Sequence, residues 1–230
     1  KRDGRTLYIG AGSLGSKIIT HNARAGKIVM GIADKDEFLE HNLGRHVLFS
    51  DKVGSNKAEA LKKELDAVYE LDKEKDIDAF PYGTADLDKG ILNSHDWIID
   101  STASFAVQNW LVQQPVKFGV NIARCELADA GRLGLLYIEG SNRNPRIDDL
   151  VNYTYYKSAS NPVLNEWRKR DMDRTVTNLN IGLGCSSPTT IMTDDTISLH
   201  ASVFSKVLFN ERHRKHIGKN GLLFRSVFES

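Results

Sequence analysis

The amino-acid sequence predicts an α/β protein with a doubly wound, mostly parallel sheet and helices on both of its faces. Two observations lead to this fold class. Short apolar segments of strand length alternate with helical segments along most of the chain. Three glycines at the spacing G-x-G-x-x-G also follow the first apolar segment, where a strand turns sharply into a helix. The 230 residues have room for one substantial core.

The predicted elements follow in a regular order. Ala58, Leu61, Leu65 and Val68, spaced three, four and three apart, mark an amphipathic helix, and "DWIID" has the continuous apolar character of a buried strand. Strands are expected at residues 6–10, 27–34, 77–83, 96–100, 120–127 and 132–140, and helices at residues 14–25, 57–69 and 104–114.

The chain changes character after residue 140. Residues 141–195 are expected to be rich in loops, with a polar helical stretch at 150–170 and a flexible Gly/Ser/Thr-rich crossover loop at 178–195. A final helix is expected at 196–209. We interpret residues 1–230 as a single domain, and the first residue, Lys1, leads us to expect a piece of a longer polypeptide.

Composition narrows the function classes. The net charge is +1 with both signs spread along the chain, which argues against a nucleic-acid or membrane-surface partner. No apolar run is long enough to span a membrane, and no signal-peptide pattern is present. The two cysteines, Cys125 and Cys185, suit a reducing cytoplasmic compartment. The sequence has no C-x-x-C pair, so a four-cysteine zinc site is not expected.

The glycines of "YIGAGSLGS" (Gly10, Gly12 and Gly15) predict a nucleotide site of the Rossmann-like type. They lie between a strand and a helix, and Asp34 ends the next strand, where a carboxylate meets a ribose hydroxyl. Helix-start N–H groups and the helix dipole favour phosphates at such a loop. This pattern fits either ATP or a dinucleotide such as NAD.

Cations after the second strand favour ATP. Arg45 and Lys57 follow this strand, and cleavage of ATP at the α-phosphorus builds up charge on the departing pyrophosphate. Arg45 offers a planar fork for phosphate oxygens, and Lys57 offers a point charge at the start of a helix. Taken alone, the two cations are more simply explained as solvated surface charges.

The pattern as a whole resembles the ubiquitin-activating-enzyme superfamily, which includes the ThiF, MoeB and HesA proteins. The shared motifs are G-x-G-x-L-G-S, D-x-D-x-x-x-x-x-N-L-x-R and V-G-x-x-K-A. The resemblance implies adenylation of the C-terminus of a ubiquitin-like or sulfur-carrier protein with ATP and Mg²⁺. It implies nucleotide contacts from Gly10, Gly12, Leu14, Gly15, Asp34, Asp36, Asn42, Arg45, Lys57 and Asp100, with catalytic roles for Arg45 and Lys57.

The tail "GSNRNPRIDDL…GLGCSSPTT" is similar to bacterial activating domains fused to a conjugating-enzyme domain. The expected partners are therefore a conjugating-enzyme domain and a second copy of the chain in a homodimer. The chain departs from the family at "DSTAS", where Ala103 replaces the Asp commonly tied to Mg²⁺. Asp100 is then the nearest acid for the metal, although a helix-capping role explains it nearly as well. The paired zinc cysteines of many bacterial members are absent, so no zinc is expected.

Cys185 is the predicted thioester-forming nucleophile, because a polar, glycine-containing loop leaves it exposed and the family's crossover loop can carry the active cysteine. Two alternatives stay open at this point. In the first, the chain is an NAD-dependent oxidoreductase. In the second, it is an inactive nucleotide-binding platform, which the alanine at position 103 would suit.

Overall fold

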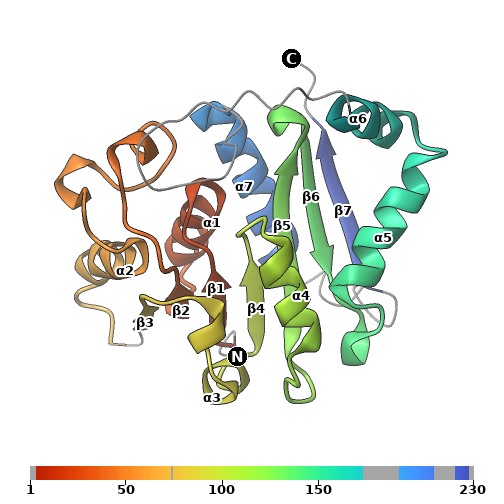
Figure 1. The fold of residues 1–230 in the computed structure, drawn as a ribbon. Coiled ribbons are helices and arrows are strands. Elements are labelled where there is room, and N and C mark those ends of the chain that lie inside the picture. The colour runs from red at the N-terminus through yellow and green to blue at the C-terminus, as the bar shows by residue number, and fades with distance from the viewer. Residues whose placement is uncertain (1–3, 74, 173–191, 210–220, 228–230) are drawn as a thin grey trace.

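The computed structural model of the protein describes residues 4–73, 75–172, 192–209 and 221–227, and it confirms the predicted fold class (Figure 1). In these residues a seven-stranded sheet has the order β3-β2-β1-β4-β5-β6-β7. Its strands are β1 (Thr6–Ile9), β2 (Val29–Ala33), β3 (Asp76–Phe80), β4 (Trp97–Asp100), β5 (Asn121–Ala128), β6 (Leu133–Ile138) and β7 (Leu222–Val227).

The sheet is parallel from β3 to β5 and antiparallel from β5 to β7. β1 lies between β2 and β4, so the chain reverses its winding direction beside β1. Open sheets of this kind bind ligands outside the carboxyl ends of the strands at such a point. The fold therefore places the glycine loop, which follows β1, where a ligand crevice forms.

Helices cover both faces of the sheet (Figure 1). One core contains buried side chains of α1 (Ser13–Arg24), α2 (Lys57–Val68) and α7 (Asp194–Phe209). The other contains those of α3 (Lys89–Asn93), α4 (Phe105–Gln113), α5 (Ile147–Ser158) and α6 (Pro162–Met172). β1 serves both cores because strand side chains alternate, with Tyr8 on the first face and Leu7 and Ile9 on the second.

The structure refines the predicted elements in the second half of the chain. The helical stretch at 150–170 is two helices, because Pro162 starts α6 and the Asn161 side chain accepts a hydrogen bond from the Leu164 N–H at 3.2 Å. α5 and α6 occupy most of the described part of 141–195, which is less rich in loops than expected. α3 and β7 were not predicted. Cys185 and most of the expected crossover loop lie outside the described residues.

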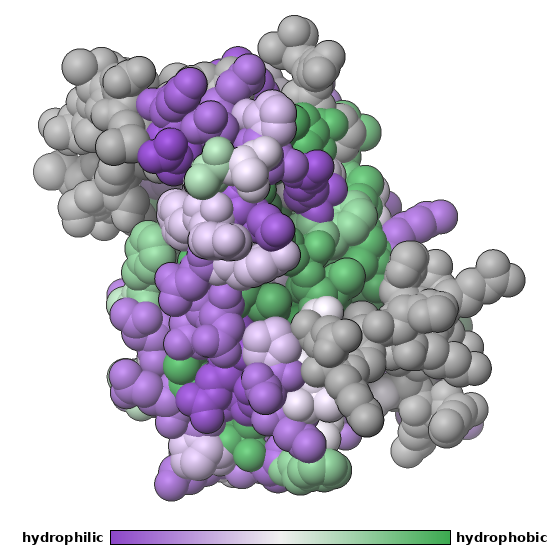
Figure 2. All heavy atoms as spheres, turned by 90° about the vertical axis from the view of Figure 1, so that its right-hand side faces the viewer, coloured by the Kyte–Doolittle hydropathy of each residue, from purple (hydrophilic) through white to green (hydrophobic). Residues whose placement is uncertain are grey.

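β7 forms one edge of the sheet, and hydrophobic side chains gather on the side of the molecule that carries it (Figure 2). Leu222, Leu223 and Phe224 are half-buried there, and Val227 is exposed. Within the described residues, no helix combines the length and the apolar character needed to cross a membrane.

Candidate nucleotide site

A cavity of about 650 Å³ opens at the carboxyl ends of β1, β2 and β4. Gly10, Gly12, Asp34, Asp36 and Lys57 line it, so the structure brings together five of the predicted site residues. The other lining residues are Ile9, Ala33, Lys35, Tyr82, Gly83, Thr84, Ala85, Ser101, Thr102, Ser104, Ala106 and Val107.

The glycine loop has a separate role for each glycine. Gly10 has a φ of +93°, a conformation that L side chains rarely adopt. Gly12 precedes α1, whose first N–H groups have no partner within the helix. A Cβ on Gly15 would collide with the carbonyl oxygen of Gly10 and the hydroxyl of Ser101. Gly15 and the buried Leu14 therefore pack behind the loop and do not line the cavity.

Asp34 fastens the glycine loop to the end of β2. Its carboxylate accepts hydrogen bonds from the Ala11 N–H at 2.6 Å and from the Asp36 N–H at 2.9 Å. Burial raises the pKa of the Asp34 carboxyl, while these backbone donors oppose that rise. A carboxylate offers about four acceptor positions, so Asp34 has acceptor capacity left for a hydroxyl group in the cavity.

Lys57 is fixed at the cavity by the start of α2. The Asn56 side chain accepts hydrogen bonds from the N–H groups of Ala58 and Glu59, and its own amide donates to the Asp34 carbonyl at 2.8 Å. The Lys57 side chain is only 9% exposed, and its Nζ lies 3.4 Å from an Asp36 oxygen. The site thus holds a desolvated ammonium group next to a half-exposed carboxylate.

Asn42 and Arg45 lie outside the residues that line the cavity. The Asn42 side chain accepts a hydrogen bond from the Leu39 N–H at 2.9 Å, which fixes a short 3-10 turn, η1 (Glu40–Asn42). Arg45 is half-buried and directly precedes His46. The described arrangement therefore gives Asn42 a local structural role.

His46 was missed by the sequence analysis and ties this segment to the glycine loop. The Leu48 N–H donates to its Nδ1 at 3.1 Å, which leaves Nε2–H to donate to the Ala11 carbonyl at 2.6 Å. Burial, together with the charges of Lys57 and Lys17, lowers the pKa of His46 to about 4. The ring is therefore neutral at pH 7. In the sequence, the position of His46 next to the predicted cation Arg45 was the available signal for a residue near the site.

Asp100 is fully buried behind the cavity. One carboxylate oxygen accepts hydrogen bonds from the Thr102 N–H at 2.9 Å and the Thr102 hydroxyl at 2.6 Å, and the other pairs with Arg124. Burial alone lowers the pKa of Arg124, but Asp100 and Glu126 raise it above its usual value. Asp100 thus contacts protein groups through both oxygens, but it does not cap the following helix. Ser104 is the N-cap of α4, and its hydroxyl accepts a hydrogen bond from the Val107 N–H.

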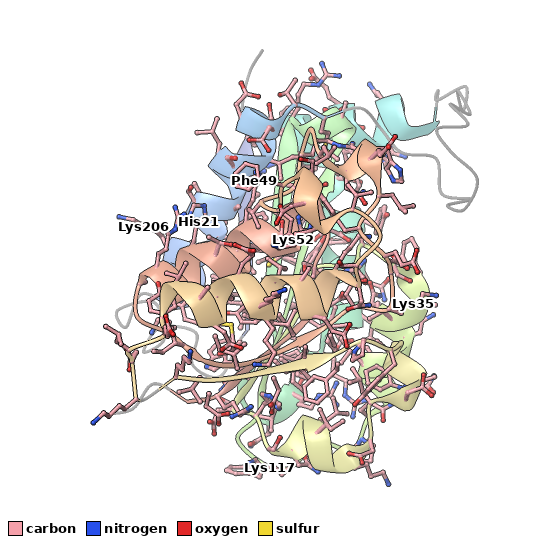
Figure 3. The ribbon with its side chains drawn as sticks, turned by 90° about the vertical axis from the view of Figure 1, so that its left-hand side faces the viewer. His21, Lys35, Phe49, Lys52, Lys117 and Lys206 are labelled. Atoms are coloured by element: carbon pink, nitrogen blue, oxygen red, sulfur yellow. The ribbon has the colours of Figure 1, made fainter. Side chains whose placement is uncertain are left out.

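The far wall of the cavity had no motif in the sequence. It comes from the loop after β3, with Tyr82 and Gly83, and from the start of α4, with Ala106 and Val107. Lys35, labelled in Figure 3, lies beside this wall, with its Cδ 3.7 Å from the place where a Cβ of Gly83 would stand. In the same view Phe49 and Lys52 lie above α2, and neither residue lines the cavity.

The cysteines and acids give no metal centre in the described part of the chain. No group of three or more His, Cys, Asp or Glu side chains that could hold a metal ion occurs there. Cys125 is completely buried, and burial raises the pKa of its thiol. Cys185 lies outside the described residues, so its predicted exposure stays a prediction.

Sequence comparisons identify relatives of this chain. The ThiF family matches residues 2–135. Cap2 of Enterobacter hormaechei subsp. hoffmannii, an ATP-dependent ubiquitin transferase-like protein, is 29% identical over 214 residues, which cover 90% of this chain and 32% of Cap2. The probable adenylyltransferase/sulfurtransferase MoeZ of Mycobacterium tuberculosis is 33% identical over 110 residues, which cover 46% of this chain and 27% of MoeZ. The matched part of this chain thus spans about a third of Cap2 and about a quarter of MoeZ.

Solved structures show the same fold. Escherichia coli MccB in complex with MccA superposes with a TM-score of 0.61 at 15% identity, covering 100% of this chain and 62% of MccB. MccB in complex with ATP superposes with a TM-score of 0.57 at 16% identity, covering 90% of this chain and 55% of MccB.

Proposed function

Because the chain belongs to the ThiF family, we propose that it is the nucleotide-binding domain of an adenylyltransferase that acts on a protein C-terminus. The proposed reaction transfers AMP from ATP to the C-terminal carboxylate of a ubiquitin-like or sulfur-carrier protein. The names of the relatives Cap2 and MoeZ support this class of substrate and reaction.

The observation that carries the proposal is the ammonium group of Lys57 in the same cavity as the glycine loop. A dinucleotide places its two phosphates on such a loop, and it needs no further cation at this position. ATP brings a third phosphate and more negative charge. A desolvated cation that is fixed before the reaction stabilises charge on a leaving pyrophosphate better than a solvated one. Lys57 therefore favours ATP over NAD.

The residues at the cavity suit the proposed step. The carrier carboxylate oxygen would form a bond to the α-phosphorus, while the bond from this phosphorus to the β-phosphate bridging oxygen breaks and pyrophosphate leaves. Gly10 and Gly12 allow close approach of the phosphates, and Asp34 would accept a hydrogen bond from a ribose hydroxyl. Lys57, with Arg45 from the neighbouring segment, would stabilise the departing charge.

We propose Mg²⁺ as the companion of ATP, since Mg²⁺ prefers phosphate oxygens together with one or two carboxylates. Asp36 fits this requirement because its half-exposed carboxylate lines the cavity. Asp100 fits it poorly, because it is fully buried, does not line the cavity and is paired with Arg124.

We also propose that the acyl group of the carrier is transferred from the adenylate to Cys185. A bond forms between the acyl carbon and the Cys185 sulfur, the bond from this carbon to the AMP phosphate oxygen breaks, and AMP leaves. The support comes from the polar, glycine-containing sequence around Cys185 and from the contrast with Cys125, whose buried thiol has a raised pKa. A conjugating-enzyme domain and a second copy of the chain are the proposed partners, on the basis of the family resemblance.

The test is ATP–pyrophosphate exchange with the cognate carrier protein. We expect exchange that depends on ATP, Mg²⁺ and carrier, and that is lost when Arg45 or Lys57 is neutralised. Tight NAD binding without ATP binding would instead identify an oxidoreductase, and ATP binding without exchange would identify an inactive platform.

The thioester step has its own test. Cys185→Ala should keep exchange and lose a carrier adduct that a thiol reductant cleaves, while Cys125→Ala keeps both. An adduct that persists in Cys185→Ala would place the nucleophile elsewhere.

A further inference from the structure

The side chain of Arg124 is 1% exposed, on β5 behind the nucleotide cavity. Its guanidinium donates to the Asp100 carboxylate, to Glu126 Oε2 at 3.1 Å and 2.8 Å, and to the Ser104 carbonyl at 3.3 Å. A planar guanidinium with five donors suits such a fork of acceptors, whereas a lysine provides a single charged group. Arg124 thus connects the end of β4 with the start of α4.

The segment between these two points forms part of the cavity wall. Ser101, Thr102 and Ser104 line the cavity. Thr102 is bound to Asp100 through its N–H and its hydroxyl, and the Thr102 hydroxyl accepts a hydrogen bond from the Ser104 N–H at 3.2 Å. Ala103 has a φ of +53°, which is unfavourable for a residue with a Cβ. The wall therefore has a strained shape that depends on contacts from behind.

We propose that Arg124 is a positioning residue for the nucleotide, and that Asp100 is its partner in holding residues 101–104 rather than a ligand of Mg²⁺. This inference rests on the proposed function. Arg124 acts through the wall, because its guanidinium contacts Asp100 and Ser104 and is not among the groups that line the cavity.

Arg143, at the end of the 3-10 turn η5 (Ser141–Arg143), provides a matched control because it contacts the other end of α4. It is also a largely buried arginine in an ion pair, with Glu139 at 2.7 Å. It donates to the carbonyl oxygens of Leu111 at 3.0 Å and Gln114 at 2.6 Å, at the C-terminal end of α4. Loss of Arg143 therefore disturbs α4 at the end away from the cavity.

The experiment compares Arg124→Lys, Arg124→Met, Asp100→Asn and Arg143→Met in the protein. For each variant, the thermal midpoint, the dissociation constant for ATP, and kcat and KM in pyrophosphate exchange are measured. The Mg²⁺ concentration for half-maximal exchange is measured at saturating ATP. Arg124→Lys keeps the positive charge next to Asp100, so this variant remains informative if Arg124→Met does not fold.

We expect Arg124→Lys and Asp100→Asn each to raise the dissociation constant and KM for ATP by about tenfold, as loss of one charge-assisted hydrogen bond would. kcat should change less than KM, and the Mg²⁺ requirement should stay constant. The Arg124→Lys, Asp100→Asn double variant should bind ATP no more weakly than the single variant with the higher dissociation constant. Arg143→Met should lower the thermal midpoint and leave KM for ATP unchanged.

Two results would overturn the inference. If Arg124→Lys keeps the wild-type KM while losing stability as Arg143→Met does, Arg124 is structural only. If Asp100→Asn raises the Mg²⁺ requirement while KM for ATP stays constant, Asp100 is a metal ligand. A wild-type protein that fails to bind ATP would overturn the proposed function itself. Direct measurement of ATP binding by the wild type therefore separates failure of the proposed function from failure of this inference.

Discussion

Two carboxylates flank the glycine loop and are held in opposite ways. β2 and β4 both pair with β1, and Asp34 follows β2 while Asp100 ends β4. Asp34 is held by backbone N–H groups and lines the cavity. Asp100 is held by the Arg124 guanidinium and lies behind the cavity. Ile9 is in register with Ala33 and with Asp100, so Asp34 lies one position further along than Asp100. The ends of two neighbouring strands have therefore acquired different surroundings.

The difference lies in what compensates each buried charge. Backbone donors hold the Asp34 carboxylate, with added stabilisation from the charge of Lys57, and it keeps acceptor capacity for a ligand. The Asp100 carboxylate has a fully buried cation, which satisfies it within the protein. We infer that the carboxylate at the end of β2 binds the nucleotide and that the carboxylate at the end of β4 supports the cavity wall.

The largest expected effect is on stability. Arg124→Met should lower the free energy of unfolding by about 3–5 kcal/mol, because it leaves the Asp100 charge buried without its partner. Denaturant unfolding measures this loss. The double variant Arg124→Met, Asp100→Leu should recover most of it, and a single variant as stable as the wild type would show that charge does not hold the end of β4.

Lys57→Met should lower the rate of pyrophosphate exchange by about a hundredfold or more, because it removes a fixed cation from developing negative charge. Lys35→Met is the matched control, since Lys35 is an exposed lysine at the edge of the same cavity. Equal losses of exchange rate in both variants would mean that the overall positive charge near the cavity, rather than the position of Lys57, stabilises the pyrophosphate.

Acidification should weaken the connection between His46 and the glycine loop. The pKa of His46 is lowered to about 4 from an unfolded value of 6.5, so the unfolded state binds the proton more readily. The stability that the neutral ring contributes is present above pH 6.5 and is lost as pH falls towards 4. The loss should be about 2–3 kcal/mol.

Denaturant unfolding at pH 7 and at pH 4.5 measures this pH dependence. His46→Gln should flatten it, although His21, His95 and His200 also have lowered pKa values and will leave a residual slope. An unchanged slope in His46→Gln would show that the other histidines account for the whole effect.

The smallest expected effect is at the other carboxylate. Asp34→Asn should raise KM for ATP by about tenfold, because it removes a charged acceptor from the ribose. A dideoxy analogue of ATP should then bind the wild type and the variant about equally. If the analogue still distinguishes the two proteins, Asp34 acts by shaping the glycine loop and not by accepting a hydroxyl hydrogen bond.

The sequence predicted the part of the site whose residues come from segments that follow one another along the chain. Gly10, Gly12, Asp34 and Lys57 lie within one β–α–β–α stretch, where local spacing determines their positions. The far wall depends on loops after β3 and β4, which come together only through the sheet. Arg124 meets Asp100 because these two residues are register partners on neighbouring parallel strands. Sequence spacing does not set this register. An arginine within an apolar strand is a signal of a buried partner, and the sequence analysis did not use it.

The contact between the Ser101 hydroxyl and the Gly10 carbonyl, at 2.8 Å, joins residues 91 positions apart. During synthesis the glycine loop therefore emerges long before the strand and turn that close it. Contacts between distant segments form late, because their loop-closure entropy must be overcome first. A ribosome-bound nascent chain that stops before β4 should carry the whole glycine motif and still fail to retain ATP, so that nucleotide capture reports completion of the central sheet.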